Sequence, residues 1–192
     1  MARVEILVEE QSMECCLREI LPKIVSDNWT LDENYFIRSH QGKSDLRKSI
    51  PTKIRTFSHW WEPVAVIILH DQDSADCVTL KKDLIELCGD CNVPILVRVV
   101  CRELESWYLG DLRAVESAYA KFRSENYLRR AQFRNPDQLG AKDYLRIILP
   151  EYQPLYSSKV TAKYMNIEGN NSESFRQFVL GVRRIFSQME HK

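Results

Sequence analysis

The chain has 192 residues, and its 27 Lys and Arg balance its 27 Asp and Glu, so the formal net charge at pH 7 is +0. This length suits one domain with a large apolar core, and neutrality excludes an overall positive field, so any phosphate-binding surface must be local. No segment approaches the roughly 18 consecutive apolar residues of a membrane span, and the first residues show no basic-then-apolar signal pattern. We therefore expect a cytoplasmic protein without a membrane span.

Apolar runs alternate with amphipathic segments over the first ~110 residues, which is the pattern of βαβ units and a parallel sheet. Strands are expected at residues 3–8, 35–38, 64–70 and 94–100. Apolar residues at helical spacing predict helices at residues 14–24 and 77–87, which would cover the sheet. Another helix is expected at residues 43–57, where Pro51 must begin, end or kink it.

The sequence changes character after Glu103, because no further strand-like run follows and the apolar residues recur at helical spacing. Helices are expected at residues 112–123, 141–149, 158–164 and 174–189. No internal repeat or long polar linker divides the chain. The sequence thus predicts one α/β domain, 1–192. A core of about four parallel strands flanked by helices would occupy about 1–112, and an all-helical extension, about 113–192, would pack on it.

Acidic residues follow three of the expected strands. They are Glu9, Glu10 and Glu14 after the first strand, Asp71, Asp73 and Asp76 after the third, and Glu103 and Glu105 after the fourth. Parallel strands end at the same edge of a sheet, and ligands of open α/β sheets bind just beyond these ends. We therefore expect the carboxylates to converge, at a cost in mutual repulsion that a divalent cation would remove.

The cation that fits such a site is Mg²⁺ or Mn²⁺, because Mg²⁺ takes oxygen ligands and is often held by one or two carboxylates together with substrate phosphate. Phosphoryl transfer or phosphodiester hydrolysis is the natural chemistry of an ion held in this way. The alternative is that the acids cap helices by accepting hydrogen bonds from backbone N–H groups. For Asp73 or Asp76 taken singly, that interpretation is the favoured one.

Two basic features would suit a phosphodiester substrate. Lys142 would neutralise charge that develops on a phosphate, and we count it as a catalytic candidate, although a lone lysine on an amphipathic helix is more often only solvated. Four arginines are interleaved with three aromatic residues, which would let them track phosphates while bases stack. They are Arg123, Arg129, Arg130 and Arg134, with Phe122, Tyr127 and Phe133. We favour the simpler interpretation of a solvated helix face with its aromatic residues in the core.

Three segments resemble Toprim-type domains. Residues 6–14, ILVEEQSME, are similar to the Val-Glu-Gly-x-Thr-Glu opening of these domains, and residues 69–73, LHDQD, to their Asp-x-Asp strand end. Residues 102–111, RELESWYLGD, resemble the Glu-x-Glu-x-Trp-Leu-x-x-Asp segment of the domain-of-unknown-function family 4276, a Toprim-like group that includes RloG-type proteins. Further similarity lies at residues 40–46, at Lys142 and at residues 172–175.

The resemblance implies a Toprim-like core in which Glu9 is the general acid/base or a metal contact. The Mg²⁺ or Mn²⁺ ligands would be Asp71 and Asp73, joined by Glu103 or Glu105. Related Toprim proteins act as topoisomerases, primases and overcoming-lysogenisation-type nucleases, and many small members occur in prokaryotic defence systems beside an ATPase. The function that this implies is a metal-dependent nuclease or related phosphodiester-processing protein, with DNA or RNA as substrate and an ATPase as partner.

Two positions depart from the Toprim pattern. Glu10 stands where Toprim domains carry glycine, so the loop after the first strand cannot use a glycine-only conformation there. The Asp-x-Asp pair is followed by Ser74, Ala75 and Asp76 without the usual glycine. Neither change removes an acidic residue. The alternative function is therefore a catalytically degenerate Toprim-like subunit that binds a partner in an ATPase-containing assembly.

Overall fold

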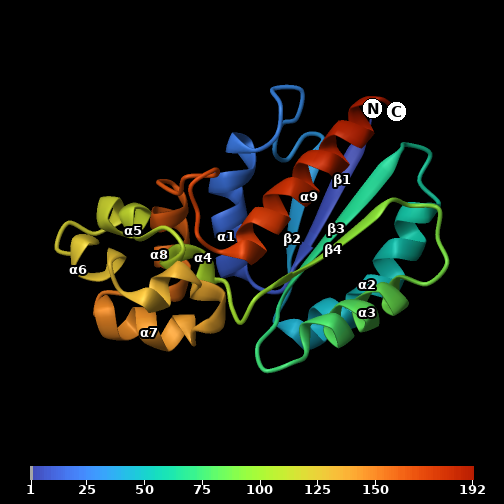
Figure 1. The fold of residues 1–192 in the computed structure, drawn as a ribbon. Coiled ribbons are helices and arrows are strands. Elements are labelled where there is room, and N and C mark those ends of the chain that lie inside the picture. Colours follow the sequence, from blue (N-terminus) through green and yellow to red (C-terminus); the bar gives the residue numbers. More distant parts are fainter. Residues whose placement is uncertain (1) are drawn as a thin grey trace.

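The computed structural model describes residues 2–192, which form an α/β fold around one sheet of four parallel strands (Figure 1). The strands are β1 (Arg3–Val8), β2 (Tyr35–Ser39), β3 (Val64–Asp71) and β4 (Ile95–Val100). Their order is β2-β1-β3-β4, so β1 and β3 are central. Every residue of β3 is buried, as expected for a parallel strand covered on both faces. The expected α/β fold with a four-stranded parallel sheet is confirmed.

Helices cover both faces of this sheet (Figure 1). One face carries α1 (Gln11–Ile20), which continues into a 3-10 turn (Leu21–Lys23), and the C-terminal helix α9 (Glu173–Glu190). The other face carries α2 (Lys43–Ser58) and α3 (Cys77–Cys88). Each helix turns an apolar stripe toward the strands; on α3 the stripe consists of Leu80, Leu84 and Cys88, four residues apart. The sheet is thus sandwiched between two apolar layers.

Helix α2 contains Pro51 in its interior, so this proline neither begins nor ends the helix. Proline lacks an N–H group and forfeits one helical hydrogen bond. Ile50 and Ile54 are buried against the sheet on either side of Pro51 in the sequence. Burial of this apolar stripe holds the helix together in spite of the local cost.

The chain after β4 forms the helical part, a term used here for residues 105–162, which lies beyond the carboxyl ends of the strands (Figure 1). Its helices are α4 (Glu105–Leu109), α5 (Leu112–Ala118), α6 (Glu125–Leu128), α7 (Ala141–Ile148) and α8 (Pro154–Ala162). The helix expected at 112–123 ends at Ala118 because Tyr119 is extended (φ −130°, ψ 102°). Tyr119 buries its ring, and its hydroxyl group lies 2.6 Å from that of Ser157.

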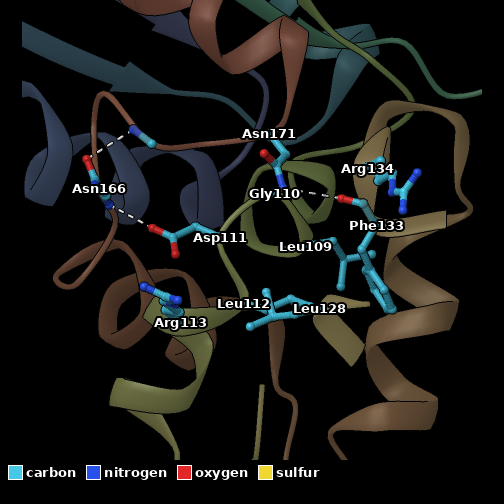
Figure 2. Close-up of a pocket in the computed structure, with 11 residues that line it drawn as sticks. Leu109, Gly110, Asp111, Leu112, Arg113, Leu128, Phe133, Arg134, Asn166 and Asn171 are labelled. Atoms are coloured by element: carbon cyan, nitrogen blue, oxygen red, sulfur yellow. Dashed lines mark hydrogen bonds between the residues drawn. The ribbon is translucent and has the colours of Figure 1, made fainter. Parts of the chain in front are cut away.

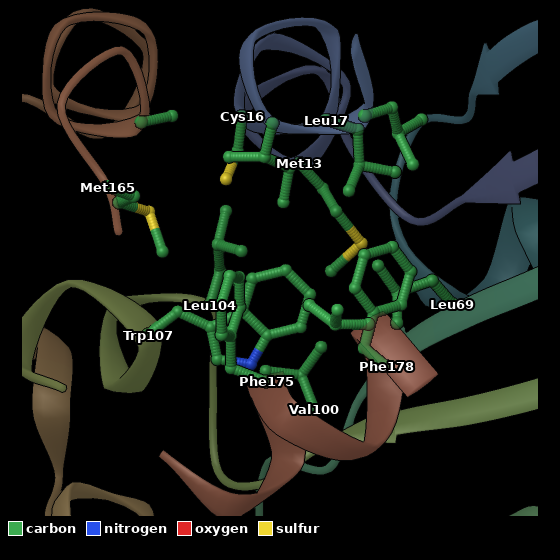
Figure 3. Packing of buried hydrophobic residues seen from close by; sticks show 14 of the residues in the cluster. Met13, Cys16, Leu17, Leu69, Val100, Leu104, Trp107, Met165, Phe175 and Phe178 are labelled. Atoms are coloured by element: carbon green, nitrogen blue, oxygen red, sulfur yellow. The ribbon is translucent and has the colours of Figure 1, made fainter. Parts of the chain in front are cut away.

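Trp107 joins the helical part to the helices that cover the sheet (Figure 3). Its ring is fully buried and packs against Phe175 and Phe178 of α9, with ring centroids 5.1 Å and 5.0 Å apart. The indole Nε1–H donates to the Ser174 hydroxyl oxygen at 3.0 Å, so its polar atom is satisfied inside the core. The tryptophan of the 102–111 segment therefore has a packing role.

Candidate functional site

The carboxyl ends of the central strands bring acidic side chains together at the edge of the sheet that faces the helical part (Figure 1). In the parallel pairing of β1 with β3, Val8 lies opposite Leu69. The residues that follow them, Glu9 after β1 and His70 in β3, therefore also lie side by side. His70 directly precedes Asp71 in the sequence. Glu105, at the start of α4, is the third member of this group. We call Glu9, Asp71 and Glu105 the acidic cluster.

Asp71 lies at the centre of the acidic cluster. Its side chain is almost entirely buried, and its Oδ1 atom has no hydrogen-bond partner among the described residues. Its main-chain N–H donates to Glu9 Oε2 at 3.3 Å. Burial, followed by repulsion from Glu9 and then Glu105, raises the pKa of Asp71 well above its ordinary value. Its surroundings therefore favour the protonated form of this carboxyl group, or a cation beside it.

Glu9 is held by two neighbours on β3. Its Oε2 atom lies 3.3 Å from His70 Nδ1 and accepts the Asp71 N–H. The His70 Nδ1 atom is also 2.5 Å from the Asp71 carbonyl oxygen. Burial raises the pKa of Glu9, and the charge of His70 opposes that rise. The one feature of the sequence that points to this contact is the position of His70 directly before Asp71.

Glu105 is the inward-facing member of the Glu103/Glu105 pair. It is buried, accepts the Tyr152 hydroxyl hydrogen and lies 3.9 Å from Lys142 Nζ. Burial raises the pKa of Glu105, against the hydrogen bond from Tyr152 and the charge of Lys142. Glu103 Oε1 instead accepts the main-chain N–H of Lys142 at 2.6 Å, in the first turn of α7. Glu103 thus binds the free N–H at the start of that helix.

Asp73 lies near the acidic cluster, since its charge, after burial and nearer groups, helps to raise the pKa of Glu9 and of Asp71. Its backbone is in the left-handed region, with φ 52°, and its Oδ2 atom lies 2.9 Å from Lys43 Nζ at the start of α2. The protein's own cation therefore neutralises this carboxylate. Asp76 caps α3, where its Oδ1 atom accepts the Thr79 N–H at 2.8 Å, so the cap interpretation is confirmed for Asp76.

The acidic cluster is made of carboxylate groups. Carboxylate oxygens are the ligands that Mg²⁺ prefers, and the buried Asp71 Oδ1 atom has no hydrogen-bond partner among the described residues. Within residues 2–192, no group of three or more His, Cys, Asp or Glu side chains is placed so that it could hold a metal ion. Since Mg²⁺ usually keeps several waters and needs one or two carboxylates, Asp71 with Glu9 or Glu105 would hold it.

The aromatic residues of the arginine-rich segment belong to the core. Phe122 and Phe133 are buried, and Tyr127 stacks on Phe122 at 5.3 Å between ring centroids. The arginines of the segment remain exposed; Arg130 lies over the Tyr127 ring at 4.7 Å. The interpretation that we favoured from the sequence, a solvated face with core aromatics, is confirmed for these aromatic residues.

A separate cavity of about 370 Å³ lies beside this segment, where α5 begins (Figure 2). Asp111, the last residue of the 102–111 segment, lines it. Both carboxylate oxygens of Asp111 are engaged: Oδ1 accepts the Ala114 N–H at 3.1 Å and Oδ2 accepts the Asn166 N–H at 2.8 Å. Asp111 therefore caps α5 and fixes the loop before α9.

Comparisons of the chain with protein-family models, with curated proteins and with solved structures gave no match. The Toprim-like resemblance therefore rests on the sequence motifs alone. The length and apolar character that crossing a lipid bilayer demands are not found together in any helix of residues 2–192.

In the absence of divalent ions, the protein should lose stability as the pH rises above about 4. The pKa values of Asp71, Glu9 and Glu105 are raised in the folded state, so between the ordinary and the raised values the folded chain binds more protons than the unfolded chain. The free energy of unfolding therefore decreases through this window. We expect a lower melting temperature at about pH 8 than at about pH 5.5 in EDTA, by scanning calorimetry.

The melting temperature of the Asp71→Asn variant should fall less over this pH interval, because its amide does not titrate. Asp27→Asn, which changes an exposed aspartate in a turn, serves as the matched control. Its melting temperature should depend on pH with the same slope as that of the unmodified protein. A melting temperature that rises over the same pH interval, or an Asp71→Asn slope equal to that of Asp27→Asn, would contradict the assigned role of Asp71.

Proposed function

We propose that this protein is a Mg²⁺- or Mn²⁺-dependent nuclease or a related phosphodiester-processing protein that acts on DNA or RNA. The observation that carries the proposal is the buried and unpaired Oδ1 atom of Asp71, placed among Glu9 and Glu105 at the carboxyl edge of the sheet. Clefts at this edge are where open α/β sheets bind ligands. Perturbed carboxyl groups gathered in one place are also typical of functional sites.

The residues around the ion would have distinct roles. When bound, the ion would polarise a phosphoryl oxygen and lower the pKa of an attacking water. Glu9, with a pKa raised by burial and a hydrogen-bonded orientation, suits a general acid/base. Lys142 lies beside Glu105 with its side chain part-exposed, so its ammonium group would meet phosphate charge at the mouth of the cluster.

The second candidate is a partner-binding subunit that retains the fold without turnover. The Lys43–Asp73 ion pair favours it, because a carboxylate neutralised within the protein has less need of a metal ion. A role in prokaryotic defence and an ATPase partner are proposals that rest on the Toprim-like resemblance, and a cytoplasmic location is a separate proposal.

The test is cleavage of end-labelled DNA and RNA, single- and double-stranded, with Mg²⁺, with Mn²⁺ and with EDTA. The unmodified protein, Asp71→Asn and Asp27→Asn are compared. We expect metal-dependent products from the unmodified protein and from Asp27→Asn, and roughly 10³-fold less cleavage by Asp71→Asn. Equal products from all three, or none from any, would reject the nuclease. In the second case, a protein that also fails to bind Mg²⁺ would favour the partner-binding subunit.

A further inference from the structure

Strand β4 is an edge strand of the sheet. It pairs with β3 alone. The carbonyls of Pro94 and Val100 accept hydrogen bonds from the N–H groups of Val66 and Gln72, in and just after β3. Alternate residues of β4 therefore turn their main-chain groups toward β3 and away from it. The main-chain groups of Ile95, Val97 and Val99 consequently point away from β3, and of these the Val97 carbonyl accepts a hydrogen bond from Arg98 Nη1. Such an edge is a template for a further strand.

A groove of about 330 Å³ lies along this edge, between α3 and α9. Three cationic side chains from different elements line it: Lys81 of α3, Arg98 of β4 and Arg184 of α9. The lining contains no Asp or Glu. Within residues 2–192 none of the three forms an ion pair, whereas the adjacent Lys82 and Arg183 both do. The groove is therefore positively charged and unneutralised.

Arg98 is held in place by main-chain carbonyls. Its Nε–H donates to the Gln177 carbonyl of α9 at 3.0 Å, and Nη1 donates to the Val97 carbonyl at 3.3 Å. This close approach to α9 requires glycine at position 181, where a Cβ atom would lie 2.8 Å from Arg98 Nη2. Burial, and then the charge of Arg184, lowers the pKa of Arg98. Arg98 held near the exposed Arg184, without a carboxylate, matches an anionic group supplied from outside.

We propose that the β4 edge binds an extended segment of a partner protein, with alternating acidic and apolar residues, as a fifth strand of the sheet. Side chains of an added strand point alternately to the two faces. On the α9 face they would meet Arg98 and Arg184, which suits acidic residues. On the α3 face they would meet Ile85 and, farther along the helix, Val78, both of which are exposed large apolar residues.

A second copy of this chain is the poorer occupant. Pairing of β4 with β4 about a two-fold axis would place the same cations on both sides of the interface, where like charges repel. An acidic partner has the complementary charge, and it would also pair main-chain groups of the edge, among them the Val97 and Val99 N–H groups.

The probe for this proposal is a fluorescein-labelled peptide of four Glu-Val repeats, with a four-repeat Lys-Val peptide and a backbone N-methylated Glu-Val peptide as controls. We expect the Glu-Val peptide to bind with a dissociation constant of about 0.1 mM and to slow hydrogen exchange of the Val97 and Val99 amides. Both control peptides should bind at least about tenfold more weakly, because one has the wrong charge and the other cannot pair its main chain.

Arg184→Glu and Arg183→Glu make a matched pair, because they reverse consecutive arginines on α9 and only Arg184 lines the groove. Arg184→Glu should weaken binding about tenfold, and Arg183→Glu less than about twofold. Equal effects of the two variants, or binding without slower exchange at Val97 and Val99, would overturn the proposal. A dimer in sedimentation, with its β4 amides already protected from hydrogen exchange, would also overturn it. The same holds if a single-stranded oligonucleotide displaces the Glu-Val peptide and this displacement depends on Arg184.

Discussion

Asp71→Asn should lower metal-dependent cleavage roughly 10³-fold and should at the same time raise the melting temperature of the metal-free protein. A metal ion supplies several kcal/mol of transition-state stabilisation, and a loss of about 4 kcal/mol corresponds to about 10³-fold in rate. Asn is almost the same size as Asp, so the variant removes charge and leaves the packing intact. The cleavage assay described above measures the first effect.

The gain in stability has a separate physical cause. Asp71 is buried next to Glu9 and Glu105, and burial and repulsion both disfavour its charged form. A neutral amide removes this cost. In EDTA at about pH 8, we expect the free energy of unfolding to increase by about 1 kcal/mol, which raises the melting temperature of a chain of this size by about 2–4 °C. Added Mg²⁺ should stabilise the unmodified protein and leave Asp71→Asn unchanged. A destabilised Asp71→Asn variant would show that the carboxylate is a structural group.

Trp107→Ala should cost about 3–5 kcal/mol of unfolding free energy, the largest effect on stability that we expect from a single truncation. The ring is fully buried against Phe175 and Phe178, and its loss leaves a cavity between the helical part and α9. Ser174 also loses the indole N–H that its hydroxyl oxygen accepts. Urea unfolding followed by far-UV circular dichroism measures the change.

The matched control is Trp61→Ala, because Trp61 is 88% exposed and its truncation should change the unfolding free energy by less than about 0.5 kcal/mol. Trp107→Phe should recover much of the stability, since it keeps most of the buried ring. Comparable effects of Trp107→Ala and Trp61→Ala would contradict the packing role assigned to the tryptophan of the 102–111 segment.

The sheet and the position of its acidic edge were predictable because both depend on short-range patterns. The apolar run that ends in Asp71 marks a buried strand, and every residue of β3 is indeed buried. The contact between Glu9 and β3 follows from parallel register, with Val8 opposite Leu69. A pattern of alternating strands and helices is enough to predict parallel strands, and parallel strands place their carboxyl ends at one edge.

The orientation of the individual acids depended on residues distant in the sequence. Glu105 turns inward to Tyr152 and Lys142, whereas Glu103 turns to the first turn of α7. Asp73 faces Lys43, thirty residues earlier, from a left-handed backbone conformation. Spacing alone carries no information about these partners, because they are set by how the helical part and α2 pack around the edge of the sheet.

Calorimetric titration with Mg²⁺ tests most directly whether the acidic cluster is a metal site. The unmodified protein and Asp27→Asn should each bind Mg²⁺ with a dissociation constant in the millimolar range or tighter, and Asp71→Asn should give no heat of binding. Absence of binding by the unmodified protein, or the same affinity in Asp71→Asn, would contradict the account of this site.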